Sequence, residues 1–459
     1  MRFPVRKEKQ VVVPEAAAAL VTFLAENNIE TIRAGGVDLD GLWRAKSVAA
    51  EAVAKGKPLS LSDFVFGIDI HDQLYEPNGA FTGWKTGWPD ITMQLDARTL
   101  RSIPWEDGIA TAICDYVGWD GNPIDLSPRY VLRQAERAVA NAGLEARVGV
   151  ELEFFVLDGR PKLTESGTFV APPPILFGSH SYHPFRGVEQ LERWSRILRD
   201  YGLPIESSLT EWGPGQFEIN LHYGSPVEVA DNIVMFKHAI KELAAREGLT
   251  VTFIARMASD GPGSSGHCHV SLWNNGTNVF FDESAPHGAS ELLRRFAAGV
   301  IANYRDVAVL ALPFVNSYRR VGEYLSSPTR LNIGVENRTT GLRAITHNPG
   351  GARLELRVPG ADANPYLTLA TLLHTGIKGL EDDLPPAEFL YDDGYVDLAA
   401  PKVPRSLDEG IDCLERSDVA RKFFGDAFVD HYLHSRRWEL EQWRQTVTTW
   451  ELARYLEMV

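Results

Sequence analysis

The chain has 459 residues, of which 44% are hydrophobic and 23% charged, and its formal net charge is −15. This length predicts two or three domains with a large core, and the negative charge disfavours nucleic acid, whose binding requires clustered lysine and arginine. Three widely spaced cysteines disfavour a disulfide framework or a zinc ribbon, and without an apolar run for a membrane helix or signal peptide we expect a cytoplasmic protein.

Hydrophobic periodicity and turn residues predict a mixed α+β protein. An Asp-Gly pair at 40–41 predicts a hairpin between two early strands, and an aromatic, glycine-containing loop with Tyr75, Trp84 and Trp88 follows. Helices are predicted over residues 14–27, 128–142, 189–201, 227–247, 289–307, 365–380 and from 406 to the C-terminus. Strands are predicted over residues 30–33, 42–45, 63–70, 90–95, 149–155 and 251–255.

The strand predicted over 149–155 carries two carboxylates, Glu151 and Glu153. Successive side chains of a strand point to opposite faces, so these two carboxylates share one face. The same spacing returns in His267-Cys268-His269 and in Glu355-Leu356-Arg357, while Glu211 and Glu218 flank a Pro-Gly turn. The pattern predicts one cleft lined by five glutamates and two histidines.

Carboxylate-rich clusters with few imidazoles suit Mg²⁺ or Mn²⁺, whereas zinc favours histidine and cysteine. Two such ions commonly hold phosphates, and seven arginines between 319 and 357 predict a local anion site nearby. The chain has neither a Walker phosphate loop nor a kinase glycine loop, so phosphoryl transfer requires another fold.

The order of several short motifs resembles the type I glutamine synthetase family over nearly the whole chain. These motifs are GVELEFF at 149–155, Glu211 to Glu218, GHCHVS at 266–271, NSYRR at 316–320, ENR at 336–338, RLELR at 353–357 and GADANPY at 360–366. The resemblance implies a β-grasp domain over 1–118, then a catalytic domain over 119–459 with a curved antiparallel sheet and surrounding helices. It also implies a homo-oligomer, a dodecamer of two stacked hexameric rings with active sites between subunits.

The activity implied is phosphorylation of the side-chain carboxylate of L-glutamate by ATP, followed by displacement of phosphate by a nitrogen nucleophile, with two divalent metals. By motif position, Glu153, Glu211 and Glu218 would hold one metal, and Glu151, His267 and Glu355 the other. Contacts to ATP would come from Glu206, Tyr223, His269, Ser271, Arg343 and Arg353. Glutamate would be bound by Gly263, Arg320, Arg338 and Arg357, and Arg338 would also stabilise the transferring phosphoryl group.

Two departures from the family pattern concern the nitrogen substrate. Ser326 stands where glutamine-forming members have a glutamate, and Asn78 stands where they have an aspartate beside the ammonium. Ammonium must be desolvated and deprotonated before it attacks, so losing both carboxylates argues against it. Neutral residues leave room for a substituted nitrogen, and aromatic residues such as Trp84 favour an apolar or cationic primary amine. We therefore predict a γ-glutamylamide synthetase, with an amine pocket at Asn78, Trp84 and Ser326.

Three alternatives remain open from the sequence. Glu323 could replace the missing base in an ordinary glutamine synthetase that uses ammonia. The chain could also be a catalytically inert relative, although keeping six acidic and imidazole ligands together disfavours that reading. A zinc hydrolase built on His267 and His269 is the third. Further departures, Pro262 and Gly350, stand where the family commonly has asparagine and lysine, and residues around Tyr391 do not support regulation by adenylylation.

Overall fold

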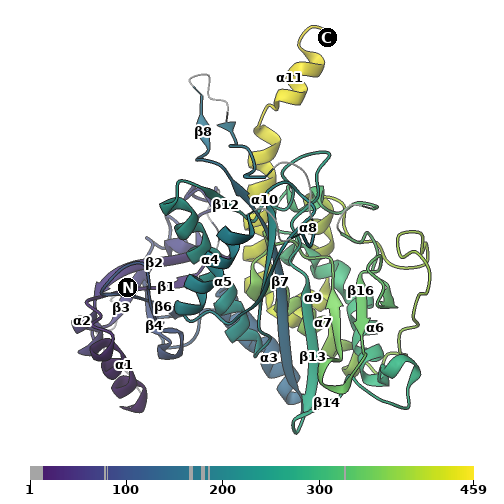
Figure 1. Ribbon diagram of the computed structural model, residues 1–459, viewed down its shortest axis with the longest axis horizontal. Coiled ribbons are helices and arrows are strands. Elements are labelled where there is room, and N and C mark those ends of the chain that lie inside the picture. Colours follow the sequence, from purple (N-terminus) through teal and green to yellow (C-terminus); the bar gives the residue numbers. More distant parts are fainter. Residues whose placement is uncertain are drawn as a thin grey trace.

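The computed structural model describes residues 14–76, 79, 81–164, 169–176, 181–183, 187–324 and 327–459. It contains two large sheets and a set of helices packed on them (Figure 1). The predicted α+β class is confirmed. None of the helices formed by these residues has the length and apolar content that crossing a membrane requires.

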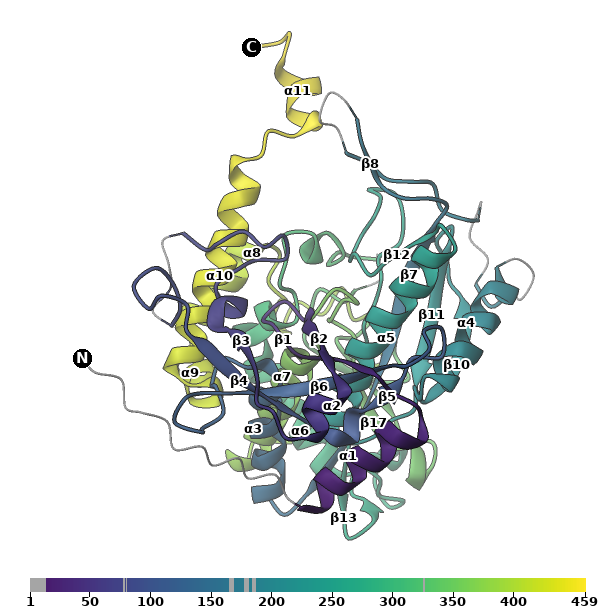
Figure 2. The ribbon, with the colours of Figure 1, turned by 90° about the vertical axis from the view of Figure 1, so that its left-hand side faces the viewer.

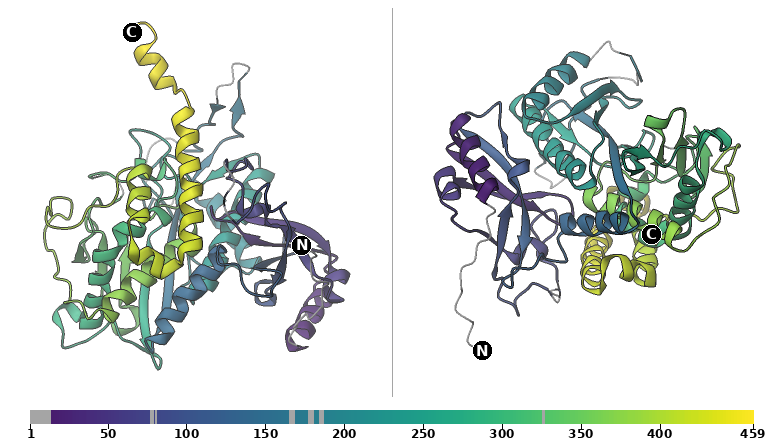
Figure 3. Two further views of the ribbon diagram at one scale, coloured as in Figure 1. Left: turned by 180° about the vertical axis from the view of Figure 1, so that it is seen from behind. Right: turned by 90° about the horizontal axis from the view of Figure 1, so that it is seen from below.

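The first sheet lies at one side of the molecule (Figures 2 and 3). Its strands follow the order β2-β1-β6-β4-β3, with β5 paired to β6, and the β1–β6 pair is parallel. The strands are β1 (Thr31–Val37), β2 (Trp43–Ala49), β3 (Leu59–Ser62), β4 (Asp90–Leu95), β5 (Arg101–Ser102) and β6 (Ile109–Val117). The helices α1 (Pro14–Glu26) and α2 (Ala50–Ala54) accompany it. The division of the chain after residue 118 stays a prediction.

The second sheet is built on the long strand β7 (Glu145–Leu157) and has the order β10-β11-β7-β13-β17-β16-β15. Its other strands are β10 (Ile205–Thr210), β11 (Gln216–Leu221), β12 (Thr250–Thr252), β13 (Cys268–Asn274), β14 (Thr277–Asn278), β15 (Ile333–Val335), β16 (Leu342–Ile345) and β17 (Arg353–Leu356). The pairs are antiparallel, as expected, except for β15 and β16, which pair in parallel. A separate hairpin is formed by β8 (Lys162–Leu163) and β9 (Phe169–Val170).

Helices bury one face of the second sheet. Val150, Leu152 and Phe154 of β7 point into the core, where Phe154 packs against Phe217 and Phe253. The helices are α3 (Pro128–Asn141), α4 (Val188–Asp200), α5 (Pro226–Arg246), α6 (Glu291–Val307), α7 (Pro365–Glu381), α8 (Leu407–Glu415), α9 (Asp418–Phe424), α10 (Asp426–Gln445) and α11 (Thr449–Tyr455). With one face buried, the polar side chains of β7 are confined to the other face.

Two predicted elements need correction. Residues 63–70 form no strand; a short 3₁₀ helix covers Asp63–Phe66, and the side chain of Ser62 accepts a hydrogen bond from the backbone of Phe64 at its start. The C-terminal region is not one continuous helix, because Ser417 caps the start of α9 and Gly425, at φ 79°, separates α9 from α10. Glycine adopts this left-handed conformation without a steric penalty.

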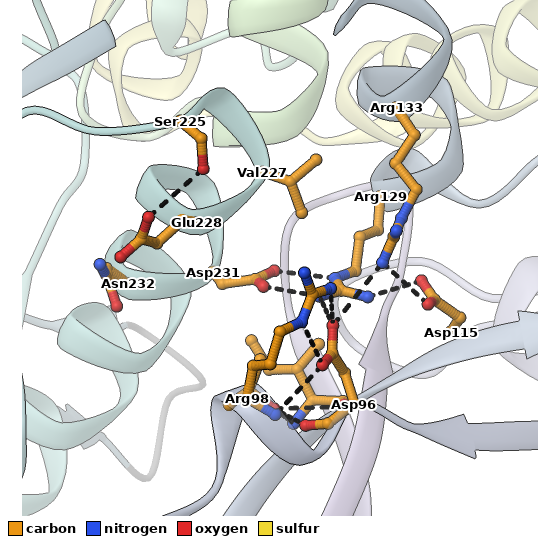
Figure 4. Close-up of polar contacts among 12 residues, drawn as sticks. Asp96, Arg98, Asp115, Arg129, Arg133, Ser225, Val227, Glu228, Asp231 and Asn232 are labelled. Carbon is orange, nitrogen blue, oxygen red and sulfur yellow. Dashed lines mark hydrogen bonds and ion pairs between the residues drawn. The ribbon is translucent and has the colours of Figure 1, made fainter. Parts of the chain in front are cut away.

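A buried arginine joins the first sheet to the helices of the second (Figure 4). The side chain of Arg129, on α3, is only 2% exposed and donates two hydrogen bonds to Asp231 of α5, at 2.9 and 2.7 Å. It also donates to Asp115 of β6 and to Asp96, each at 2.7 Å. Arg98 and Arg133 also pair with Asp96, and Arg133 with Asp115, so Asp231 is the one of the three carboxylates that, among the described residues, forms an ion pair with Arg129 alone.

Candidate functional site

Strand register brings the predicted polar residues together on the uncovered face of the second sheet. Glu153 of β7 lies opposite Glu218 of β11, and His269 of β13 lies opposite Glu355 of β17. Glu151 and Glu153 share this face, as the sequence predicts. The site therefore rests on adjacent strands that fix its backbone, with loops contributing only part of it.

Glu151, His267 and Glu355, called here the histidine cluster, each offer a ligand atom within 4.8 Å of the others. The His267 Nδ1 atom lies 3.3 Å from a Glu151 oxygen and 3.4 Å from a Glu355 oxygen. His269 Nε2 lies 3.0 Å from the second Glu151 oxygen. Arg353 donates from Nε to His269 Nδ1 at 3.2 Å, so Nδ1 is the acceptor and the ring proton on Nε2 points at Glu151.

Two arginines share the charge of Glu355. Arg343 donates to one oxygen of Glu355 at 3.0 Å, and Arg357 donates to the other. Burial would raise the pKa of Glu355, whose side chain is 1% exposed, but His267 and Arg357 hold it below its usual value. The carboxylate is thus kept ionised in a buried place.

The other two members of the histidine cluster, Glu151 and His267, are also held in the protonation states that bind a metal ion. Burial would raise the pKa of Glu151, yet hydrogen bonds from His267 and His269 keep it well below its usual value. Burial and the nearby Arg357 lower the pKa of His267 to about 4. A neutral imidazole and ionised carboxylates are the protonation states that bind a cation.

Glu153, Glu211 and Glu218, called here the carboxylate cluster, likewise offer atoms within 4.8 Å of one another. Gln216 Nε2 donates to Glu153 at 2.9 Å, and the backbone amide of Ser265 donates to the same oxygen at 2.8 Å. Asn220 donates to Glu218 at 2.8 Å. These neutral donors orient the oxygens without cancelling their charge.

The electrostatics of the carboxylate cluster differ from those of the histidine cluster. Burial, with repulsion from Glu211, raises the pKa of Glu153 to about 7, and burial, with repulsion from Glu151, raises that of Glu218 to about 8. The pKa of Glu211 is raised as well, mainly by burial. No described lysine, arginine or histidine forms an ion pair with any of these three glutamates. The charge of Arg320 lowers the pKa of Glu153 and so offsets only part of this effect.

Both clusters fit hard divalent cations. Their donors are carboxylate oxygens and a single imidazole, which suit Mg²⁺ or Mn²⁺ better than tetrahedral zinc. A divalent ion would relieve the repulsion that raises the pKa values of the carboxylate cluster. The zinc alternative loses support because His269 is hydrogen bonded to Glu151 and Arg353 and lies outside the metal-binding group.

A cavity of about 350 Å³ opens beside the histidine cluster, between β7, β11 and β13. Five of the six residues predicted to contact ATP line it: Glu206, Tyr223, His269, Ser271 and Arg353. The sixth, Arg343, is not in the lining and instead bonds Glu336 and Glu355. Gly350 also lines the cavity, so the lysine common at this position in the family is absent from its wall.

The residues predicted to bind glutamate fall into two pairs. Arg320 is 1% exposed and packs against Gly263, where an added Cβ would lie 2.4 Å from Arg320 Cγ. Its guanidinium donates to the backbone carbonyls of Val358 and Pro359. Arg357 donates to the carbonyl of Arg338 at 3.2 Å, and the side chain of Arg338 is exposed.

The predicted amine pocket is only partly visible. Asn78 and Ser326 lie outside the described residues, and Glu323 is exposed. Trp84 is 67% exposed, and its ring packs edge-on against Trp88 with centroids 4.2 Å apart. It is not among the residues that line the cavity.

Several residues of the site were missed from the sequence. Arg147 and Gly149 line the cavity, and Asn220 does so from β11. Gln216 bridges Glu153 and the carbonyl of Gly263, at 2.9 Å each. The alternation that joins Glu151 to Glu153 also places 147 and 149 on this face, and 216, 218 and 220 share a face in the same way.

Known proteins resemble the chain along most of its length. The family model described as "Glutamine synthetase, catalytic domain" matches residues 125–455. A glutamate–isopropylamine ligase from a Pseudomonas species is 36% identical over 447 residues, covering 95% of this chain and 97% of that protein. A type-1 glutamine synthetase from Dictyostelium discoideum is 32% identical and covers 93% of this chain and 84% of that protein.

A γ-glutamylethanolamide synthetase from Streptomyces coelicolor is 32% identical, covering 97% of this chain and 96% of that protein. Among solved structures, one described as a GmaS/ADP complex superposes with a TM-score of 0.81 at 27% identity. It covers 95% of this chain and 99% of the matched chain. The similarity therefore spans both sheets.

Proposed function

Because the chain belongs to the glutamine synthetase family, we propose that it joins the γ-carboxylate of L-glutamate to a primary organic amine, converting ATP to ADP and phosphate. The observation that carries this proposal is the pair of acidic clusters on one face of the sheet, of which the histidine cluster adjoins the cavity through Glu151. Two of the relatives are named for isopropylamine and ethanolamide chemistry. Their names support an organic amine but identify none for this chain.

ATP would occupy the cavity between β7 and β13. Its phosphates would lie toward Glu151 and His269, and its ribose and base toward Glu206 and Tyr223. Arg353 is held by the carbonyl of Gly351 at 3.0 Å and by His269, so its charge is fixed at the cavity wall before the nucleotide arrives. Fixed positive charge of this kind stabilises phosphate without reorganisation during the reaction.

Mg²⁺ or Mn²⁺ would be held by Glu151, His267 and Glu355 and by Glu153, Glu211 and Glu218. When bound, these ions would neutralise phosphate charge as the phosphoryl group moves. Arg343 and Arg357 keep Glu355 ionised and oriented, and the amide of Ser265 orients Glu153. The chain thus prepares both clusters before substrates bind.

In the first step, a γ-carboxylate oxygen of glutamate attacks the terminal phosphorus of ATP and ADP leaves. The amine nitrogen then attacks the γ-carbonyl carbon, phosphate leaves, and the nitrogen loses a proton. We propose that Arg320, Arg357 and Gly263 hold glutamate and that Arg338 contacts the transferring phosphoryl group. An arginine fork is suited to such planar and charged oxygens.

The nitrogen substrate would bind at a site that lacks the two carboxylates with which glutamine-forming members of the family bind and deprotonate ammonium. Asn78 and Ser326 stand at those positions. Trp84 would add an apolar wall, and Glu323 is the acidic residue nearest in sequence to Ser326 that could accept a proton. We further propose that the enzyme is a cytoplasmic homo-oligomer, with two stacked hexameric rings as the expected form.

The test is ADP and phosphate release with glutamate, ATP and Mg²⁺, comparing ammonium with methylamine, ethanolamine, isopropylamine, putrescine and aniline. Mass spectrometry of the product identifies the amide. A Glu151→Gln variant controls for contaminating ATPase. Higher kcat/KM for one amine than for ammonium supports the proposal, whereas preferred use of ammonium makes the protein a glutamine synthetase, and no turnover with any donor makes it an inert relative.

A further inference from the structure

Residues 256–263 form a loop whose two ends are joined. Arg256 and Gly263 pair as an isolated antiparallel bridge, and the amide of Ser264 donates to the carbonyl of Ala255 at 2.8 Å. The loop is followed by residues 264–267, which include His267, and then by β13, which carries His269. Its conformation therefore determines where the backbone of Gly263 meets the site.

The side chain of Arg256 forms hydrogen bonds with the backbone of this loop. Its Nε donates to the carbonyl of Ala258 at 3.0 Å, and one terminal nitrogen donates to the carbonyl of Ser259 at 2.6 Å. The other terminal nitrogen donates to the carbonyl of Arg319 at 2.8 Å. All three guanidinium nitrogens therefore donate hydrogen bonds. Two of these bonds stay within the loop, and the third connects the loop to a second segment, at Arg319.

That second segment is tied to Arg256 twice more. The side-chain oxygen of Asn316 accepts from the Arg256 amide at 2.9 Å, and its side-chain nitrogen donates to the Arg256 carbonyl at 3.1 Å. Asn316 precedes the 3₁₀ helix at Ser317–Arg319, which ends next to Arg320. We call the contacts between Arg256, Asn316 and the carbonyl of Arg319 the arginine clamp.

The clamp joins the same two segments that meet where Gly263 packs against Arg320. Gly263 packs against the Arg320 stem so closely that an added Cβ would lie 2.4 Å from Cγ and 2.6 Å from Cδ. Gln216 then connects the Gly263 carbonyl to Glu153 of the carboxylate cluster. A shift of the loop would thus move Gly263 relative to both Arg320 and Glu153.

We propose that Arg256 is a positioning residue for L-glutamate, acting through the arginine clamp to fix Gly263 against Arg320. This inference rests on the proposed function, in which those two residues contact glutamate. Arginine suits the role because its planar fork can reach three carbonyls at once, whereas the ammonium of lysine is a compact point charge. The clamp contacts no residue lining the ATP cavity, so it should affect glutamate and spare ATP.

The experiment compares Arg256→Gln and Arg256→Lys with Arg294→Gln. Arg294 is the matched control, because it also donates to a loop carbonyl, that of Ala387 at 2.8 Å, but on α6. We expect Arg256→Gln to raise the KM for glutamate about tenfold and to leave the KM for ATP within about twofold. Arg256→Lys should recover part of this loss, and Arg294→Gln should leave both constants unchanged.

Hydrogen exchange without substrates supplies a readout that does not depend on turnover. Peptides covering 256–263 and 316–321 should both exchange faster in Arg256→Gln and not in Arg294→Gln. Faster exchange with an unchanged KM for glutamate would overturn the proposal, as would equal increases in both KM values. A variant that does not fold would be replaced by Asn316→Ala, which removes the other half of the clamp.

The same measurements separate this inference from the proposed function. If the enzyme prefers ammonium, the KM for glutamate measured with ammonium still tests the clamp. If no nitrogen donor supports turnover, calorimetric titration with L-glutamate compares the variants directly. Failure of the unmodified protein to bind L-glutamate would overturn both proposals.

Discussion

Replacing Glu218 by glutamine tests whether repulsion between the carboxylates of the carboxylate cluster destabilises the folded protein. Burial and neighbouring carboxylates raise the pKa of Glu218 from 4.5 to about 8, and the residue is 8% exposed. Between these two pH values the folded protein binds a proton that the unfolded chain has released. The contribution of Glu218 to stability without metal is therefore fully present below about pH 4.5, decreases as pH rises through this window and is absent above about pH 8.

The size of this loss follows from the shift. A change of about 3.5 pKa units corresponds to about 5 kcal/mol at 1.36 kcal/mol per unit, which is an upper limit because Glu153 shares the same repulsion. Glutamine cannot ionise, and its side-chain oxygen can still accept from Asn220. The variant should keep the hydrogen bond and lose the pH-dependent penalty.

The assay is chemical unfolding of EDTA-treated protein at pH 5.5 and pH 8.5. The unmodified protein should lose several times more stability between these pH values than Glu218→Gln, and Mn²⁺ at pH 8.5 should stabilise only the unmodified protein strongly. Exposed Glu283→Gln is the matched control and should behave as the unmodified protein does. Parallel pH dependence of Glu218→Gln and the unmodified protein would refute the reasoning.

Three further changes probe other parts of the molecule. Arg129→Met should lower stability by about 3 to 5 kcal/mol, measured by chemical unfolding, because it leaves the buried Asp231 without its counter-charge; exposed Arg137→Met should not. Gly149→Val should raise the KM for ATP and spare that for glutamate, because a Cβ there already reaches van der Waals contact with Tyr223 Cβ, at 3.6 Å, and the two methyl groups of valine would extend beyond it at the cavity wall. Trp84→Ala should lower kcat/KM for organic amines more than for ammonium, because this 67% exposed ring is the described member of the proposed amine pocket; equal losses would contradict that role.

Local sequence patterns predicted the core of the site because strands impose a strict period of two. Once Glu151 and Glu153 share a face, antiparallel pairing with β11 in the observed register brings Glu218 opposite Glu153. The same reasoning applies to His267 and Glu355, which meet because β13 pairs with β17. The order of these motifs along the chain also indicated the family before any fold was visible.

Other features depend on tertiary contacts that a sequence does not display. The apolar run Phe64-Val65-Phe66 suits a buried strand or a short helix, and the cap from Ser62 decides for the helix. Arg343 was predicted at ATP, but two carboxylates, Glu336 and Glu355, hold its guanidinium. The contacts of Arg256 to three carbonyls likewise require the loop and the following turn to be folded.

The two clusters differ in how their negative charge is compensated, and this difference affects how each would bind a metal ion. In the histidine cluster, Arg343 and Arg357 already compensate Glu355, so a cation there competes with charges the chain supplies itself. In the carboxylate cluster, neutral donors orient oxygens whose pKa values are raised to about 7 for Glu153 and about 8 for Glu218. A cation that binds to that cluster must displace protons near neutral pH. Once bound, it reduces the repulsion between the carboxylates, with which no described basic residue forms an ion pair. The carboxylate cluster should therefore bind its ion more tightly and with the steeper pH dependence, leaving the ion beside the ATP cavity as the exchangeable one.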